Sequence, residues 1–176
     1  MKVDPITARL RSLIPDDEYH LKMSYGNSEL SGDFLGFVDA YAVIADLLPK
    51  NMTIIDLGCY QATQCYFFKD FEQYIGVDCY DQQYSPKNYK PPLRFATDNT
   101  KHYVMTIQEF LNRYTWTYGY DVDTYFIMSA VPNMPCQILE GNCENYFWWY
   151  PGEKPKAQGL MAKEILNAYE NLSRQH

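Results

Sequence analysis

Four residues in the middle of the chain have the chemistry needed to hold a nucleotide-like ligand. Gly58 directly follows the apolar run 52–57, and its lack of a Cβ lets the backbone turn tightly and approach a ligand closely. Asp78 comes twenty residues later, at the end of a second apolar run, where a carboxylate can accept hydrogen bonds from both ribose hydroxyls. Asp98 and Asn99 end a third run and can hydrogen-bond an adenine ring or its exocyclic amine.

Each of these polar residues also has an ordinary structural interpretation. Asp56, which precedes Gly58 by two residues, can cap or brace the loop that follows its run. Asp78 can be a turn residue, and so can the pair Asp98 and Asn99, because Asp and Asn favour turns for backbone reasons. On the sequence alone, both interpretations stay open.

The elements that must position these residues alternate between strands and helices. Residues 34–48 place apolar side chains at helical spacing, with Asp33 as the expected N-cap and Pro49 ending the run. Short apolar runs predict strands at 52–57, 74–78, 93–97, 124–131 and 146–150. Helical spacing predicts further helices at 60–70, 103–114 and 157–173. The polar stretch 81–92 is predicted to be irregular.

This alternation predicts an α/β fold with a doubly wound, mostly parallel sheet and helices on both faces. A strand, a helix and a second strand within about thirty residues imply parallel pairing through a right-handed crossover. Ligands bind such sheets outside the carboxyl ends of the strands, at the switch point, so the loops after the strands are the place for a site. We expect residues 1–33 to be a lead-in segment and residues 34–176 to form a single domain.

Two of the strand ends carry a specific pattern. Ile54-Ile55-Asp56-Leu57-Gly58-Cys59 ends a strand on Asp-x-Gly, and Tyr74-Ile75-Gly76-Val77-Asp78 ends the next strand on an acid. Together they resemble the first two motifs of the class I S-adenosylmethionine-dependent methyltransferases. Phe95-Ala96-Thr97-Asp98 is similar to the third motif of that family, and residues 126–132 resemble its fourth strand. The resemblance covers roughly residues 34–132.

The resemblance implies a Rossmann-like methyltransferase domain that binds S-adenosylmethionine and acts on a small-molecule or protein acceptor. Gly58 and the nearby backbone would contact the methionine part of the cofactor, Asp78 the ribose and Asp98 the adenine. Residues 129–132 would border the reactive side. The implied cofactor-binding residues are Asp56, Gly58, Cys59, Tyr60, Asp78, Cys79, Asp98, Asn99 and Ser129. No catalytic residue is predicted.

Two departures from the family pattern leave an alternative open. Tyr60 and Ala62 stand where the family usually has glycines, which makes the loop bulkier. About forty-five residues follow the fourth strand, enough for one strand and one helix, so the usual C-terminal hairpin is expected to be missing. The alternative is a catalytically inactive member of the fold that binds a protein partner through its tyrosine- and tryptophan-rich surface. A nicotinamide dehydrogenase is less well supported, because Gly-x-Gly-x-x-Gly would need glycines at Tyr60 and Thr63.

The composition narrows the range of partners. A formal net charge of −7 disfavours nucleic acid, because the molecule repels a phosphate backbone. Five cysteines without a Cys-x-x-Cys pair and three scattered histidines predict neither a disulfide framework nor a metal site. No histidine is near Cys136 or Cys143 in sequence, so covalent catalysis is not predicted. Without a secretory signal or an apolar run of about eighteen residues, we expect a soluble, cytoplasmic protein that makes no use of a membrane.

Overall fold

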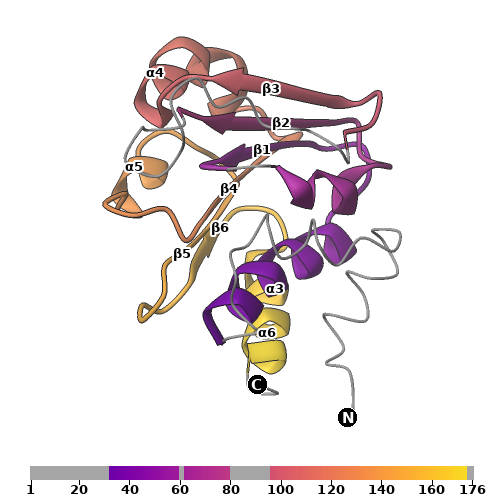
Figure 1. Cartoon of the computed structure of the whole chain (residues 1–176), viewed down its shortest axis with the longest axis vertical. Coiled ribbons are helices and arrows are strands. Elements are labelled where there is room, and N and C mark those ends of the chain that lie inside the picture. The colour runs from indigo at the N-terminus through magenta and orange to yellow at the C-terminus, as the bar shows by residue number, and fades with distance from the viewer. Residues whose placement is uncertain (1–31, 60–61, 80–95, 174–176) are drawn as a thin grey trace.

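The computed structural model describes residues 32–59, 62–79 and 96–173 of the 176-residue chain (Figure 1). Nearly all of the predicted lead-in segment lies outside the described residues, as do the stretch 81–92 and Tyr60. The domain boundary at residue 34 therefore stays a prediction.

Within the described residues, six strands form one sheet in the order β3-β2-β1-β4-β5-β6. Their bounds are β1 Thr53–Leu57, β2 Gln73–Asp78, β3 Thr100–Val104, β4 Thr124–Ser129, β5 Tyr146–Trp149 and β6 Lys156–Gln158. The first five strands are parallel to their neighbours, and β6 pairs antiparallel with β5. The chain moves outward from β1 to β3 and then returns to the other side of β1 with β4, so the switch point lies between β1 and β4. The predicted doubly wound, mostly parallel sheet is confirmed.

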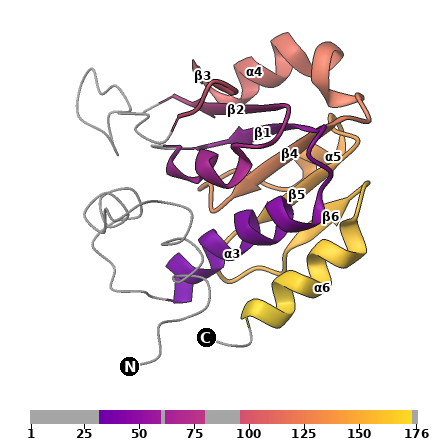
Figure 2. The ribbon, with the colours of Figure 1, turned by 90° about the vertical axis from the view of Figure 1, so that its right-hand side faces the viewer.

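Helices cover both faces of the sheet (Figures 1 and 2). Their bounds are α3 Gly32–Leu47, the 3-10 helix η1 Thr63–Phe68, α4 Ile107–Tyr114, the π-helix η2 Thr115–Gly119, α5 Gln137–Glu140 and α6 Ala162–Ser173. Core residues of α3, η1 and α6 pack together on one face, and those of α4 and α5 pack on the other. Figure 2 shows α3 and α6 lying side by side on their shared face.

The central strands are buried on both sides, which explains why they read as continuous apolar runs. Ile54 in β1 points to the face covered by α3 and α6, and Ile55 points to the face covered by α4 and α5. All six residues of β4 are buried. Strands covered by helices on both faces have no exposed side, so their sequence does not alternate between apolar and polar residues.

Three elements differ from the sequence prediction. The third described strand is Thr100–Val104. Of the predicted strand 93–97, residues 93–95 lie outside the described residues, and Ala96 and Thr97 form no strand. β3 is at the edge of the described sheet, and its partly exposed, polar sequence lacks an apolar run. The following helix begins at Ile107, where the Thr106 hydroxyl accepts a hydrogen bond from the Glu109 amide at 3.1 Å. The short strand β6, Lys156–Gln158, overlaps the start of the segment 157–173 that was predicted as one helix. α6 begins only at Ala162, and the sheet gains an antiparallel edge strand.

Within the described residues, no helix has both the length and the apolar character needed to cross a membrane.

Candidate functional site

The loops after β1, β2 and β4 leave the sheet at the same edge, because these strands are parallel. Gly58 and Cys59 follow β1, Asp78 ends β2 and Cys79 follows it, and Ser129 ends β4. The structure thus places six of the residues predicted for a site at or near the carboxyl edge: Asp56, Gly58, Cys59, Asp78, Cys79 and Ser129. Asp78 is half-buried and Cys79 is exposed.

Asp98 and Asn99 lie at the opposite edge of the sheet. They precede β3 instead of ending it, and β3 runs parallel to β2 from Thr100 onward. The Asn99 side-chain amide donates to the carbonyls of Phe68 at 3.0 Å and Phe71 at 2.8 Å, which holds the end of η1 against the sheet. The adenine contacts were predicted for residues at the end of a strand, whereas Asp98 and Asn99 lie before β3, and Asn99 holds η1 in place.

Asp56 is fully buried and is the centre of a hydrogen-bond cluster. Its carboxylate accepts from the Tyr41 hydroxyl at 2.8 Å, the Gln64 amide at 2.7 Å and the Tyr74 hydroxyl at 2.5 Å. Burial raises the pKa of Asp56 to about 6, although the three donors oppose that rise. The cluster joins α3, η1 and β2 to β1, so Asp56 braces the fold and presents no free surface to a ligand.

Several backbone groups in the described part of the loop after β1 are hydrogen-bonded within the protein. The amides of Gly58 and Cys59 both donate to the Val77 carbonyl, at 2.8 and 3.1 Å. The Cys59 carbonyl accepts from the Ala62 amide at 2.9 Å and from the Gln64 side chain at 3.0 Å. Ala62 takes a left-handed conformation with φ of 56°. These backbone groups are therefore already paired, although the resemblance would have them face a cofactor.

Gly58 meets two requirements that only glycine fulfils. Its φ of +78° lies in the left-handed region, and a Cβ built there would lie 2.4 Å from Cγ2 of Val131. Val131 belongs to the loop after β4, so its side chain occupies the space that Gly58 leaves open. The glycine thus joins the loops after β1 and β4 at the switch point.

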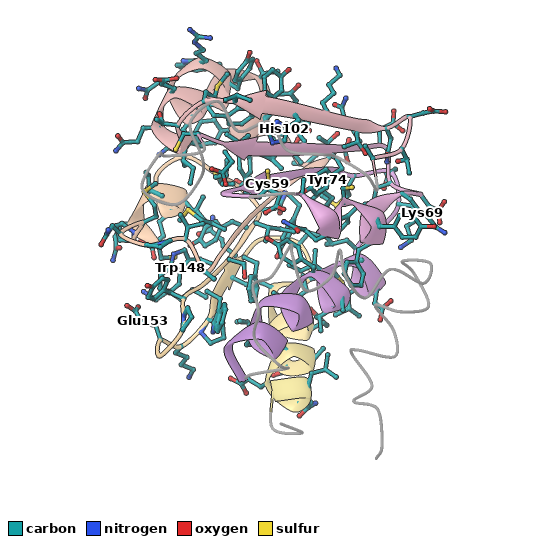
Figure 3. The ribbon with its side chains drawn as sticks, viewed as in Figure 1. Cys59, Lys69, Tyr74, His102, Trp148 and Glu153 are labelled. Atoms are coloured by element: carbon teal, nitrogen blue, oxygen red, sulfur yellow. The ribbon has the colours of Figure 1, made fainter. Side chains whose placement is uncertain are left out.

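A thiol and an imidazole meet beside this loop. Cys59 Sγ lies 3.4 Å from His102 Nε2, and both approach across Gly76, where a Cβ would lie 2.8 Å from the sulfur (Figure 3). Burial lowers the pKa of His102, and the Asp78 carboxylate opposes that change. The sequence prediction missed His102, because only the correct register of β3, which pairs His102 with Gly76, could have revealed it.

Ser129 is buried at the end of β4, and its hydroxyl has no hydrogen-bond partner among the described residues. Its register partner in β5 is Trp149, whose side chain packs on the face of α3 and α6. Ala130 follows in a left-handed conformation with φ of 58°, which turns the chain sharply out of the sheet. Ser129 is therefore buried within the end of β4 and does not project from the carboxyl ends of the strands.

A cavity of about 440 Å³ lies farther along the same edge, between the loop after β4 and the hairpin of β5 and β6. Its lining includes Val131, Asn133, Met134, Trp148, Glu153 and Lys156. The sequence did not predict this cavity, because the cavity depends on how the hairpin folds beside the loop after β4. Val131 both lines the cavity and packs against Gly58.

The cysteines and acidic residues offer no metal centre within residues 32–59, 62–79 and 96–173, where no three potential ligands gather. All five cysteines are free thiols. Burial raises the pKa of Cys65 and of Cys143 to about 12, so both thiols stay protonated and unreactive at neutral pH.

Comparison with known proteins gives likenesses in structure alone. No family model matches the sequence, and no curated protein matches it. A cyclopropane-fatty-acyl-phospholipid synthase-like protein from Lactobacillus casei is 12% identical, with 66% of this chain and 49% of that chain covered and a TM-score of 0.43. The plantazolicin methyltransferase BpumL, in complex with a monoazolic desmethylPZN analog and SAH, is 14% identical, with 81% of this chain and 60% of that chain covered and a TM-score of 0.44.

HcgC from Methanococcus maripaludis, cocrystallized with SAH and pyridinol, is 15% identical, with 80% of this chain and 65% of that chain covered and a TM-score of 0.30. This chain spans about half the length of the first of these structures and 60% of the second. The assignment to the doubly wound α/β class rests on the strand order of its own sheet.

Proposed function

We propose that this protein is an S-adenosylmethionine-dependent methyltransferase whose acceptor is still to be identified. The observation that carries the proposal is the position of Asp78, which is half-buried at the carboxyl end of β2, next to the Gly58 loop and the switch point of a doubly wound sheet. This is where such sheets bind the ribose of an adenosine-type cofactor. The free thiols support a reducing compartment such as the cytoplasm.

Each residue at the edge has a distinct part in this proposal. Asp78 accepts hydrogen bonds from the ribose hydroxyls, and His102, whose pKa is lowered by burial, lies on the strand beside it. Asp56 and Gln64 do not contact the cofactor; they hold the loop after β1 in place through their hydrogen bonds. When bound, the cofactor supplies an activated methyl group, so the protein's task is to hold the acceptor in line with it. This task needs no dedicated catalytic side chain.

One observation favours a second candidate, a binding module of the same fold without methyl transfer. Val131 fills the space beside Gly58, and the amides of Gly58 and Cys59 are already bonded to Val77. Asp78 lies where it could bind the ribose of the cofactor. Beside Gly58, however, the Val131 side chain takes up the space that the methionine part of the cofactor would need. Apolar side chains that are exposed, Trp116 to 92% and Tyr120 to 60%, could contact a protein partner of such a module.

Calorimetric titration with S-adenosylmethionine and S-adenosylhomocysteine tests the first candidate without knowledge of the acceptor. We expect saturable binding at micromolar ligand. Asp78→Ala should weaken binding by about 1–3 kcal/mol, because the ribose hydroxyls lose their acceptor. Asp98→Ala is the matched control, since it removes an exposed carboxylate from the opposite edge of the sheet and should leave the affinity unchanged.

The absence of heat at millimolar ligand would reject the methyltransferase. Val131→Ala then separates the two candidates further, because it empties the space beside Gly58 without touching Asp78. Binding that appears only in the Val131→Ala variant would identify the protein as a module whose cofactor site Val131 has closed.

A further inference from the structure

The lining of the cavity beside the β5–β6 hairpin does not include Asp78 or Gly58. Its volume of about 440 Å³ lies within the range of small-molecule sites. Lys156 is the register partner of Trp148 across the antiparallel pair, and Glu153 lies in the connection between the two strands. In Figure 3, Trp148 and Glu153 lie beside this hairpin, away from Cys59 and His102.

A carboxylate and an ammonium group line this cavity, and they do not pair with each other. Glu153 and Lys156 are both exposed, and within the described parts of the chain neither side chain makes an ion pair or a hydrogen bond. Burial raises the pKa of the Cys136 thiol, and the Lys156 ammonium is among the groups that oppose this rise, so its charge acts on the cavity wall. An unpaired carboxylate and an unpaired ammonium in one cavity suit a ligand that carries both charges.

The aromatic side chains of Trp148 and Tyr150 form another part of the cavity wall, and a hydrogen bond fixes the position of Trp148. The Trp148 indole N–H donates to the Met134 carbonyl at 2.9 Å, which fixes the ring between β5 and the loop after β4. Tyr150, half-buried at the end of β5, extends the same wall. Flat aromatic surfaces favour an aromatic or large apolar group in the ligand.

We propose that this cavity binds a free α-amino acid with an aromatic side chain. The ammonium group of the ligand pairs with Glu153, its carboxylate pairs with Lys156, and its ring lies on the wall of Trp148 and Tyr150. The site goes beyond the proposed methyl transfer and needs no cofactor. A failure of this proposal and a failure of cofactor binding are therefore separate results.

Three ligands that share one ring test the charge pattern on the full chain. L-Phenylalanine carries both charges, phenethylamine lacks the carboxylate, and phenylpropionate lacks the ammonium. The readout is the indole N–H signals of the three tryptophans in NMR titrations. Trp148 should shift, whereas Trp149, on the other face of the sheet, and the exposed Trp116 serve as internal controls. We expect phenylalanine to bind at least about tenfold more tightly than either partial ligand.

Variants then assign each charge to its partner. Glu153→Gln should weaken phenylalanine and phenethylamine by about tenfold and leave phenylpropionate unchanged. Lys156→Met keeps the apolar stem of the lysine and should weaken phenylalanine and phenylpropionate while leaving phenethylamine unchanged. Lys154→Met and Glu164→Gln remove exposed charges outside the cavity and should leave all three affinities as they are.

The proposal is overturned if none of the three ligands shifts Trp148 at millimolar concentration. It is also overturned if all three ligands bind equally, or if the Lys154→Met control weakens phenylalanine as much as Lys156→Met does. Because Glu153 and Lys156 are exposed, their variants are expected to fold, and unchanged signals of Trp149 verify this in the same spectra.

Discussion

Folding removes the Asp56 carboxylate from water and raises its pKa. Because of this shift, Asp56 makes the protein more stable as the pH falls, the reverse of what most carboxylates do. Its folded pKa of about 6 lies above the reference value of 3.8, so between these values the folded state holds a proton that the unfolded state has lost. One pKa unit corresponds to about 1.4 kcal/mol, so the difference amounts to about 3 kcal/mol. The free energy of unfolding should therefore begin to rise as the pH falls from about 7 through 6, and this gain should be complete near pH 4.

Urea unfolding at a series of pH values measures this contribution. Asp56→Asn cannot titrate, so the difference in unfolding free energy between wild type and variant should change by up to about 3 kcal/mol over that pH interval. Asp98 is exposed at the opposite end of the strands, so the unfolding free energy of Asp98→Asn should differ from that of wild type by the same amount at every pH. A constant difference between wild type and Asp56→Asn would show that the pKa of Asp56 is not raised.

At the scale of single elements, Asn145 connects three parts of the chain. Its side-chain amide donates to the carbonyl of Thr124 at 3.1 Å and to that of Val122 at 3.3 Å, and its Oδ1 accepts from the Leu160 amide at 2.8 Å. Gly159 makes this approach possible, since a Cβ there would lie 2.2 Å from Asn145 Oδ1. The residue therefore joins the starts of β4 and β5 to the turn between β6 and α6.

Replacing Asn145 should separate its donor and acceptor roles. Asn145→Ala leaves buried backbone groups unpaired and should lower the unfolding free energy by about 1–3 kcal/mol. Asn145→Asp keeps the acceptor for Leu160 but places an oxygen against two carbonyls, so it should be at least as destabilising. Urea midpoints decide between these outcomes, and wild-type stability of Asn145→Asp would contradict the donor role.

The elements differ in how far their sequences predicted them. β1 and β4 are buried on both faces, so their apolar runs gave positions that the structure confirms to within one or two residues. Among the described strands, β3 has a neighbour on one side only, and the polar sequence Thr-Lys-His-Tyr-Val carries no such signal. Because β3 begins at Thr100, Asp98 and Asn99 lie at its start and not at its end, and His102 lies within it, which the apolar runs did not predict. The cavity depends on tertiary contacts of the hairpin, which no local pattern encodes.

At the scale of the whole molecule, the first and last described helices close the same face. α3 and α6 pack side by side in both views, although they are far apart in the sequence (Figures 1 and 2). Ile165 of α6 is fully buried among residues of α3 and the sheet, and the Tyr169 ring lies 6.2 Å from that of Trp149. We infer that α6 is part of the cooperative core and not a helix that detaches by itself.

Ile165→Ala tests this inference, because it removes buried methyl and methylene groups from the contact between the helices. It should lower the unfolding free energy by about 2–5 kcal/mol, while Lys163→Ala, exposed on the same helix, should stay within about 0.5 kcal/mol of wild type. Far-ultraviolet circular dichroism follows all helices and strands together. In proteins that carry Trp116→Phe and Trp148→Phe in addition, tryptophan fluorescence follows Trp149 beside Tyr169. If α6 belongs to one cooperative unit, both signals of the variant shift together; an earlier transition in fluorescence alone would mean that α6 unfolds first.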